Sequence, residues 1–395
     1  MLNYYFNSDD FQAGRVIIGI HEDCIQRLIP ATGEGIVFGI EITSVRILFQ
    51  SRSSQSDIGA IIMIELRTNN PDAVIRAIEW LNEDPCVVFA EPDFFMQPHI
   101  IPNDPYYGYL WGLQKIDCPS AWNHTTGSSD VIVGITDSGI NYNHPDLKDN
   151  MWTAPRGLGI HGRDFETNTD DPIDNTGHGT HVAGTVGAVG NNFIGITGVC
   201  WTVKLAALKI GSAFFDLAAA IGAINYANRN NITILNNSWG SRFYSTALKY
   251  AVDNYNGLFI VSAGNESSNN DLFPIYPANF ESKNIISVAA SNQYNELASF
   301  SNYGVTSVDV AAPGTDILST SFQGDYSYMA GTSMAAPHVA GAAALLKGYR
   351  PELTSLEIKD IILSSVDKRP QFYNRVSTGG TINISRMMEI ADLML

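Results

Sequence analysis

The chain has 395 residues, enough for two domains, and 45% hydrophobic against 16% charged residues allows large packed cores. This composition excludes a disordered or fibrous protein. With 23 Lys plus Arg against 40 Asp plus Glu, the net charge is −17, which repels nucleic-acid backbones and anionic membranes. No apolar run approaches the roughly 20 residues of a membrane span. We therefore expect neither a nucleic-acid partner nor a membrane span.

The pattern of residues 1–100 predicts a small α+β unit, followed by a proline-rich linker from Pro92 to Pro105. Its first ten residues, Met1–Asp10, lack the basic and apolar regions of a signal peptide. The predicted helix has a proline in its first turn and carries Val74, Ile78 and Leu81 on one face. The predicted elements are strands at Arg15–Ile20, Ala60–Leu66 and Val87–Glu91 and a helix at Pro71–Leu81.

The four cysteines, Cys24, Cys86, Cys118 and Cys200, are too far apart in sequence for a C-x-x-C metal or redox motif. Two disulfides or four free thiols both fit the sequence. A bridge from Cys24 or Cys86 to either of the other two would keep the N-terminal third attached after a cleavage, which argues against that pairing.

From about residue 130 the sequence alternates strands with helices. Such alternation predicts a mostly parallel sheet covered by helices on both faces, with the chemistry at the carboxyl ends of the strands. The predicted strands are Val131–Ile135, Val203–Ile210, Ile232–Leu235, Leu258–Val261 and Ile285–Val288, and the predicted helices lie near 216–230 and 246–255.

Two polar residues follow predicted strands closely. Asp137 comes just after Val131–Ile135, and a buried carboxylate there needs a donor such as an imidazole N–H. An Asx turn that closes the strand is the alternative. Asn265 comes after Leu258–Val261 and is either a turn residue or a side-chain amide that donates to an oxyanion.

The segment Gly177–Gly184 carries two histidines three residues apart among small residues. A zinc site is not indicated, because the H-E-x-x-H pattern is absent. We expect His181 to be satisfied in the core. We expect His178, just before a helix, to reach both an aspartate and a nucleophile.

The segment Gly331–Gly341 leads into a long apolar helix. We expect Pro337 in the first turn and Ser333 at or near the helix N-terminus, where unpaired N–H groups and the dipole favour negative charge. Ser333 is therefore either an N-cap or a nucleophile whose backbone N–H stabilises a tetrahedral intermediate.

Together, in their chain order, these four motifs resemble those of the subtilisin-like serine proteases. Two of them, His178–Gly184 and Gly331–Gly341, look like uninterrupted family signatures, and other serine-hydrolase triads follow different chain orders. The resemblance covers residues 101–395 and implies an α/β catalytic domain there. It also implies a serine endopeptidase that acts on polypeptides through an acyl-enzyme, without a catalytic cofactor.

The resemblance implies that Ser333 is the nucleophile of this chain, that His178 is its base and that Asp137 orients the imidazole. Asn265 and the N–H of Ser333 would hold the oxyanion. The substrate would lie extended along the segment 236–240, which the resemblance marks for binding and in which the family usually has a smaller aliphatic side chain than a tryptophan. This chain has Trp239 there, and we therefore expect the bulky Trp239 ring to reshape a subsite. The substrate-binding residues implied are Ser238, Trp239 and Gly240.

The resemblance also implies a structural Ca²⁺ site built from hard oxygen ligands. Plain turns are the alternative for each of its segments. The implied ligands are the side chains of Asp104, Asp146 and Asn192 and the carbonyls of Val189, Ile194 and Ile196.

Residues 1–100 resemble the prodomains that assist folding and inhibit these proteases, which implies a zymogen that processes itself. In that case the tail near Met96–Pro102 occupies the active site until cleavage. A permanent accessory domain is the alternative. The family favours an extracellular protein, whereas the N-terminus shows no signal peptide, so the compartment stays open. Rival functions are a catalytically silent scaffold or activator on the same fold and an esterase.

Overall fold

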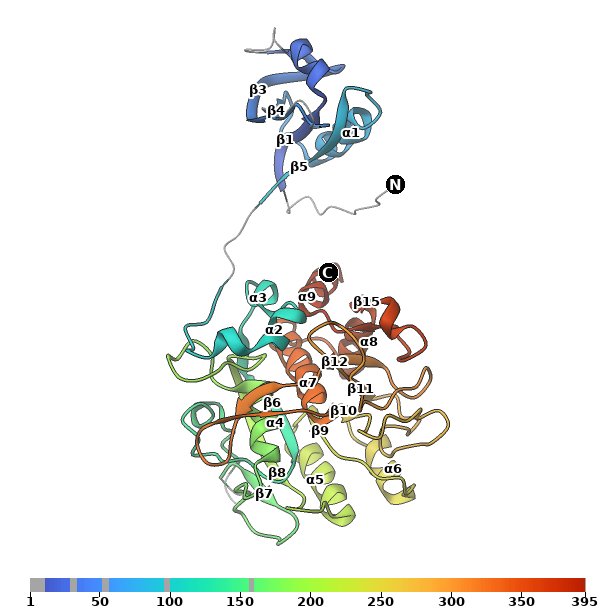
Figure 1. Ribbon diagram of the computed structural model, residues 1–395. Helices are drawn as coiled ribbons and strands as arrows, with labels where there is room; N and C mark the ends of the chain where they lie inside the picture. The colour runs from blue at the N-terminus through green and yellow to red at the C-terminus, as the bar shows by residue number, and fades with distance from the viewer. Residues whose placement is uncertain (1–10, 29–33, 52–56, 96–99, 156–159, 395) are drawn as a thin grey trace. The chain divides into compact units, whose positions relative to one another are not determined.

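The computed structural model describes residues 11–28, 34–51, 57–95, 100–155 and 160–394 (Figure 1). The chain divides into two compact units, Met1–Pro98 and His99–Leu395. Residues 1–10 and 96–99, which include the segment tested for a signal peptide and part of the predicted linker and tail, lie outside the described residues.

The first unit is an antiparallel sheet with strand order β2-β3-β4-β1-β5, with α1 packed against β1 and β5. The side chain of Asn70 caps α1 by accepting from the N–H of Asp72, and Pro71 occupies the first turn. The buried face of the helix includes the three apolar residues predicted for it. Its elements are β1 (Phe11–Ile20), a 3₁₀ helix (Glu22–Leu28), β2 (Gly35–Val37), β3 (Ile40–Gln50), β4 (Ala60–Leu66), α1 (Pro71–Leu81) and β5 (Val87–Phe94).

A disulfide joins Cys24 to Cys86, so it lies within the first unit. Cys118 and Cys200 are free thiols buried in the second unit. The four cysteines thus form one bridge, which is neither of the two arrangements that the sequence suggested. The expectation that no disulfide would join the N-terminal third to the remainder is confirmed.

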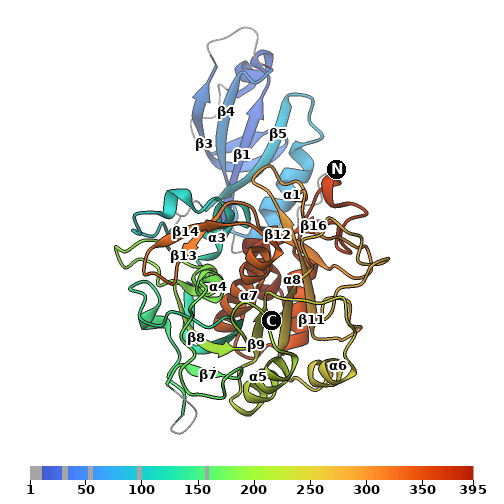
Figure 2. The same ribbon diagram turned by 60° about the horizontal axis from the view of Figure 1, so that its bottom comes forward.

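The second unit is an α/β domain with a nine-stranded sheet (Figure 2). The strand order is β15-β16-β12-β11-β10-β9-β6-β8-β7, and every neighbouring pair is parallel except β15 with β16. Its strands are β6 (Gly127–Asp137), β7 (Gly162–Asp164), β8 (Thr202–Lys209), β9 (Ile234–Asn237), β10 (Leu258–Ser262), β11 (Ile285–Ser291), β12 (Val310–Pro313), β15 (Asp367–Lys368) and β16 (Gly380–Thr381), with a separate hairpin of β13 (Ile317–Thr320) and β14 (Tyr326–Met329).

Helices cover both faces of this sheet. On one face α7 packs against β6, β9, β10, β11 and β12 and contacts α4, and on the other face α5 packs against β6, β8 and α6. Along β8 the side chains alternate, with Leu205 in the core under α7 and Leu208 in the core under α5. The helices are α2 (Trp111–Lys115), α3 (Cys118–Ala121), α4 (His178–Gly187), α5 (Leu217–Arg229), α6 (Thr246–Asp253), α7 (Thr332–Tyr349), α8 (Ser355–Ser364) and α9 (Ile384–Asp392), with 3₁₀ turns at Tyr107–Tyr109, Lys148–Asn150 and Pro370–Phe372.

The strand order reverses at β6. After β6 the chain forms β7 and β8 on one side and then β9 and β10 on the other. In open parallel sheets the crevice at such a switch point, outside the carboxyl ends of the strands, is where ligands bind. Asp137 ends β6 and Asn237 ends β9, so the functional motifs of the sequence lie at this crevice. Among the described residues, no helix has the length and apolar character to cross a membrane.

Candidate active site

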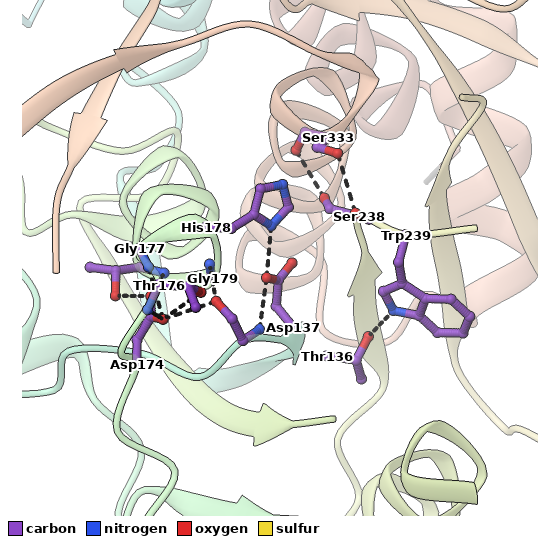
Figure 3. A network of polar contacts seen from close by, with 12 residues as sticks. Thr136, Asp137, Asp174, Thr176, Gly177, His178, Gly179, Ser238, Trp239 and Ser333 are labelled. Carbon is purple, nitrogen blue, oxygen red and sulfur yellow. Dashed lines mark hydrogen bonds and ion pairs between the residues drawn. The ribbon is translucent and has the colours of Figure 1, made fainter. Parts of the chain in front are cut away.

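Asp137 is fully buried at the end of β6. Its Oδ1 accepts a hydrogen bond from Nδ1 of His178 at 2.7 Å and another from the N–H of Ser138 at 2.8 Å (Figure 3). These two donors hold the carboxylate in one orientation, and the carboxylate in turn fixes the N–H of the imidazole on Nδ1. The Nε2 atom is therefore left as the acceptor of a neutral ring.

His178 is the first residue of α4, rather than the residue before it, and its side chain keeps 32% of its surface exposed. Burial lowers the pKa of the imidazole, but the charge and hydrogen bond of Asp137 and the charge of Asp174 raise it. The pKa of His178 consequently lies above its ordinary value. A base whose pKa is raised in this way holds a proton firmly once it has taken one.

Ser333 is the second residue of α7 and is locked to the end of β9 by two hydrogen bonds. Its Oγ donates to the carbonyl of Ser238 at 3.2 Å, and its carbonyl accepts from Oγ of Ser238 at 2.9 Å (Figure 3). The second bond has a local cause. Pro337 lies four residues on and has no N–H, so the Ser333 carbonyl lacks its helical donor and takes the Ser238 hydroxyl instead.

The expectation that Pro337 lies in the first turn is wrong, because it is the sixth residue of α7. The helix begins earlier than the proline suggests. Thr332 is the first residue of α7, and its N–H donates a hydrogen bond to the side chain of Asn265. Asn265 thus replaces the capping side chain that Gly331, at the N-cap position, lacks. Proline is tolerated here because the carbonyl that it leaves without a donor is satisfied from another strand end.

Among the residues that the structure describes, no hydrogen bond joins the imidazole of His178 to the hydroxyl of Ser333. In the view of Figure 3 the ring stands between Asp137 and the pair formed by Ser333 and Ser238. The hydroxyl proton of Ser333 points to the Ser238 carbonyl instead. A rotation of the Ser333 side chain is therefore required before its proton can reach Nε2, and such contacts commonly tighten only when substrate binds.

Asn265 faces Ser333 across the start of α7. Its Oδ1 accepts from the N–H of Thr332 at 2.8 Å and from the Thr332 hydroxyl at 3.0 Å, so its NH₂ group is turned the other way. A methyl group added at Gly331 would lie 3.5 Å from Nδ2 of Asn265 and 3.6 Å from the N of Ser333. The same methyl group would lie 3.7 Å from Oδ1 of Asn265, so the Asn265 amide and the N of Ser333 border one small space beside Gly331.

A polar hollow of about 300 Å³ opens beside these donors. Its lining residues include Ser238, Trp239, Gly240, Ser262 and Asn265. The indole of Trp239 donates to Oγ1 of Thr136 at 3.2 Å and packs edge-on against Phe259. The ring is therefore held against the sheet, pointing away from Ser333 in Figure 3.

His181 is fully buried, as expected of a core residue. Its Nε2 lies 3.0 Å from the carbonyl of Ile317 and 3.1 Å from that of Ser327, which places the N–H on Nε2. Burial lowers the pKa of His181 to about 4, so the ring is neutral near pH 7.

The residues expected at a Ca²⁺ site meet around one loop. Asp104 and Asp146 are both buried. Burial raises the pKa of Asp104 above its ordinary value and raises the pKa of Asp146 to about 6. Asp146 accepts from the Asn192 amide at 2.8 Å and from the N–H of Ile196 at 2.9 Å, and its carbonyl accepts from Val189. The remaining residue, Ile194, donates its N–H to Oδ1 of Asn192.

Oδ1 of Asp104 is buried without a hydrogen-bond partner among the described residues. Two buried carboxylates that disfavour ionisation, one with an unpaired oxygen, fit a bound cation well. The described residues contain no cluster of three His, Cys, Asp or Glu, so a zinc-type site has no support there, whereas Ca²⁺ takes carbonyl and amide oxygens readily.

Sequence reasoning missed three residues that organise this site: Ser238 as the partner of Ser333, Thr332 as the group that orients Asn265, and Asp174. The first two pairings join residues 95 and 67 positions apart, so no local pattern reveals them. Asp174 had a local signal, because an aspartate shortly before a helix start is a common N-terminal cap.

A parallel α/β sheet whose crevice holds an Asp–His pair, a serine at a helix N-terminus and a donor-lined hollow defines a serine hydrolase. Residues 128–379 match the Subtilase family, and the chain belongs to that family. It is a serine-type endopeptidase that acts on polypeptides.

The chain is 40% identical over 311 residues to "Thermophilic serine proteinase" of Bacillus sp. (strain AK1), covering 77% of this chain and 72% of that protein. It is 38% identical over 299 residues to subtilisin E of Bacillus subtilis (strain 168), covering 73% of each. A solved structure of a protease from Pseudoalteromonas arctica PAMC 21717 superposes with a TM-score of 0.62 at 28% identity, covering 73% of this chain and 99% of that one.

Proposed function

We propose that Ser333, His178 and Asp137 form the catalytic triad of this endopeptidase. The Ser333 hydroxyl turns from the Ser238 carbonyl to Nε2 of His178, gives up its proton and attacks the peptide carbonyl. Asp137 keeps the imidazole in the required tautomer and stabilises the imidazolium. His178 then passes the proton to the leaving amine, and water repeats the sequence on the acyl-enzyme. The observation that carries this proposal is the 2.7 Å bond between Asp137 and His178.

The oxyanion of each tetrahedral intermediate is held by Nδ2 of Asn265 and the N–H of Ser333. The position of both nitrogens beside Gly331 supports this role, since an atom there would lie about equally far from them. The donors are in place before the reaction, so no reorganisation accompanies the development of charge.

Substrate binds as an added strand along Ser238, Trp239 and Gly240, with the side chain before the scissile bond in the adjacent hollow. Support comes from the position of this segment, which follows β9 directly and lines the hollow. The Trp239 ring is anchored on Thr136 and Phe259, which holds the segment that would pair with substrate in place at this residue.

Residues 1–98 act as a prodomain that the enzyme removes itself. The unit has its own apolar core and its own disulfide. All four cysteines are among the described residues, and no bridge ties this unit to the next, so cleavage of the connecting segment would leave no covalent link between them. The family's chemistry needs no catalytic cofactor; the loop around Asp104 and Asp146 would hold a structural Ca²⁺ ion.

The test compares the full-length chain with its Ser333→Ala variant, using Ser364→Ala on α8 as a matched serine-to-alanine control. The parent and the control are expected to lose the N-terminal unit and to cleave casein. Ser333→Ala is expected to keep all 395 residues and to leave casein intact. Maturation or casein cleavage by Ser333→Ala contradicts the assignment, and a parent that hydrolyses only esters contradicts the peptidase function.

A further inference from the structure

Asp174 is a nearly buried carboxylate to which the proposed reaction assigns no step. It lies four residues before His178, with 5% of its surface exposed. It accepts six hydrogen bonds from four residues that surround the junction of β6 and α4 (Figure 3). The donors are the hydroxyl of Ser138, the N–H and hydroxyl of Thr176, the N–H of Gly177, and the N–H and hydroxyl of Thr180.

We propose that Asp174 is a positioning residue for the peptidase reaction, which ties the turn after Asp137 to the first turn of α4 and so keeps His178 aligned with Asp137. Asp174 touches neither substrate nor reacting atoms in this account. The inference rests on the proposed triad and adds a positioning residue to it.

The first connection runs through Ser138. Its backbone N–H donates to Asp137 at 2.8 Å, and its hydroxyl donates to Oδ1 of Asp174 at 2.9 Å. The same hydroxyl accepts from the N–H of Gly179, the residue after His178, at 2.9 Å. Ser138 therefore joins both carboxylates to the start of α4. A shift of this turn would move Asp137 and the backbone beside His178 together.

The second connection runs to the helix itself. Gly177 precedes α4 and has no side chain with which to cap it. Asp174 takes over this function, because Oδ1 accepts from the N–H of Gly177 at 3.0 Å and Oδ2 accepts from the N–H and hydroxyl of Thr180 at 3.0 and 2.6 Å. A carboxylate at a helix N-terminus also interacts favourably with the dipole. The orientation of the His178 backbone is set by these bonds.

The negative charge of Asp174 also acts on the imidazole. The other titratable groups that act on His178 or on its helix are Asp137 on β6, His181 on the helix itself and, through His181, His338 on α7. Burial lowers the pKa of His181 and of His338 to about 4, so both are neutral near pH 7. From β8, the ammonium of Lys209 reaches the carbonyl of Ile173 at 3.0 Å, and β13 (Ile317–Thr320) contains no titratable residue. Asp137 and Asp174 are thus the two carboxylates that support the imidazolium.

The experiment uses the mature parent enzyme and three variants made in the full chain. Asp174→Asn removes the charge and places an NH₂ group opposite the N–H of Thr180. Ser138→Ala removes only the hydroxyl link. Asp271→Asn is the matched control, because Asp271 accepts five hydrogen bonds from Val305, Thr306 and Ser307 in a loop far from His178 in sequence. The readouts are kcat, KM, the pH profile of kcat/KM and stability in urea.

Asp174→Asn is expected to lower kcat about 10–100-fold with little change in KM, since a misplacement of about 1 Å costs that much. The acid limb of its pH profile is expected to move to lower pH, because the imidazolium loses a stabilising charge. Asp271→Asn is expected to lose stability while keeping kcat and the pH profile. If Asp174→Asn does not fold, Ser138→Ala decides the question, with an expected loss in kcat of about 2–13-fold.

An active parent together with an Asp174→Asn enzyme that keeps its kcat and its acid limb overturns the inference, even if that variant is less stable. A Ser138→Ala enzyme with unchanged kcat overturns it when Asp174→Asn cannot be obtained. A parent without peptidase activity, or a Ser333→Ala variant that retains it, overturns the proposed triad itself. The two failures are therefore distinguishable.

Discussion

Asn265 offers a test of the oxyanion hole in which catalysis and stability can be separated. Its Oδ1 accepts two hydrogen bonds from Thr332, and its Nδ2 borders the same space beside Gly331 as the N of Ser333. Asn265→Asp keeps an acceptor for Thr332 but replaces the donor by an anionic oxygen. Asn265→Ala removes both groups. The two variants should therefore both lose kcat, whereas their free energies of unfolding should differ.

The magnitudes follow from these contacts. Removal of one oxyanion donor costs about 10²–10³ in kcat, which is about 2.7–4 kcal/mol of transition-state stabilisation. Asn265→Asp should lose at least as much, because its carboxylate repels the oxyanion. The two bonds to Thr332 contribute about 0.5–1.5 kcal/mol each. Asn265→Ala should accordingly lower the free energy of unfolding by about 1–3 kcal/mol, and Asn265→Asp by less.

The assay is steady-state hydrolysis of a chromogenic peptide, with urea unfolding of the inactivated enzyme as the measure of stability. Both variants are expected to keep KM near the parent value, because the donor acts mainly in the transition state. If either variant keeps kcat within about threefold of the parent, Asn265 does not hold the oxyanion and the donor assignment fails.

Three further predictions concern the cation site, the pH profile and the half-buried Lys359. Chelation of Ca²⁺ should lower the Tm of the mature enzyme by about 5–10 °C in calorimetry, if the ion is present at about 100 times its Kd. The kcat/KM should fall about tenfold per pH unit below the pKa of His178, and this limb should lie above the ordinary imidazole pKa because the folded value is raised. Lys359→Met should lower the free energy of unfolding in urea by about 1–3 kcal/mol, since its Nζ donates to the carbonyls of Ile285 and Lys283.

Each of these predictions has a control. Asp104→Asn should abolish the effect of the chelator, and an unchanged Tm of the parent after chelation would remove the cation site. A kcat/KM that stays level down to about pH 5 would show that His178 is not the base. Lys148→Met, at an exposed lysine, should leave stability unchanged, and an equal effect of both lysine substitutions would argue against the role given to Lys359.

The second unit was largely predictable because its strands are apolar runs bounded by turn residues. Val203–Ile210 was predicted as a strand, and β8 spans Thr202–Lys209. The helix predicted near 216–230 is α5, which Asp216 caps. In the first unit, β3 (Ile40–Gln50) escaped prediction. Its side chains are mostly exposed or half-buried, so its sequence lacks the alternation of a strand that covers a core.

Contacts between distant residues could not be predicted. The start of α7 was predicted too late, because Pro337 was expected in its first turn. The helix can begin earlier because the Ser333 carbonyl, which Pro337 leaves without a helical donor, accepts from the hydroxyl of Ser238, nearly a hundred residues earlier. The sequence likewise suggested the roles of Ser333 and His178 without showing that the Ser333 hydroxyl rests on the Ser238 carbonyl. Local chemistry identifies the reactive groups, whereas their resting hydrogen bonds depend on which strand ends meet.

The most direct test of the proposed triad is chemical labelling of the mature enzyme with a fluorophosphonate, followed by peptide mass spectrometry. We predict a single adduct on Ser333 that forms rapidly in the parent and at least about 10³-fold more slowly in His178→Ala, since the hydroxyl is a weak nucleophile without its base. An adduct on any other residue, or labelling of Ser333 at the parent rate without the imidazole, would contradict the proposed mechanism.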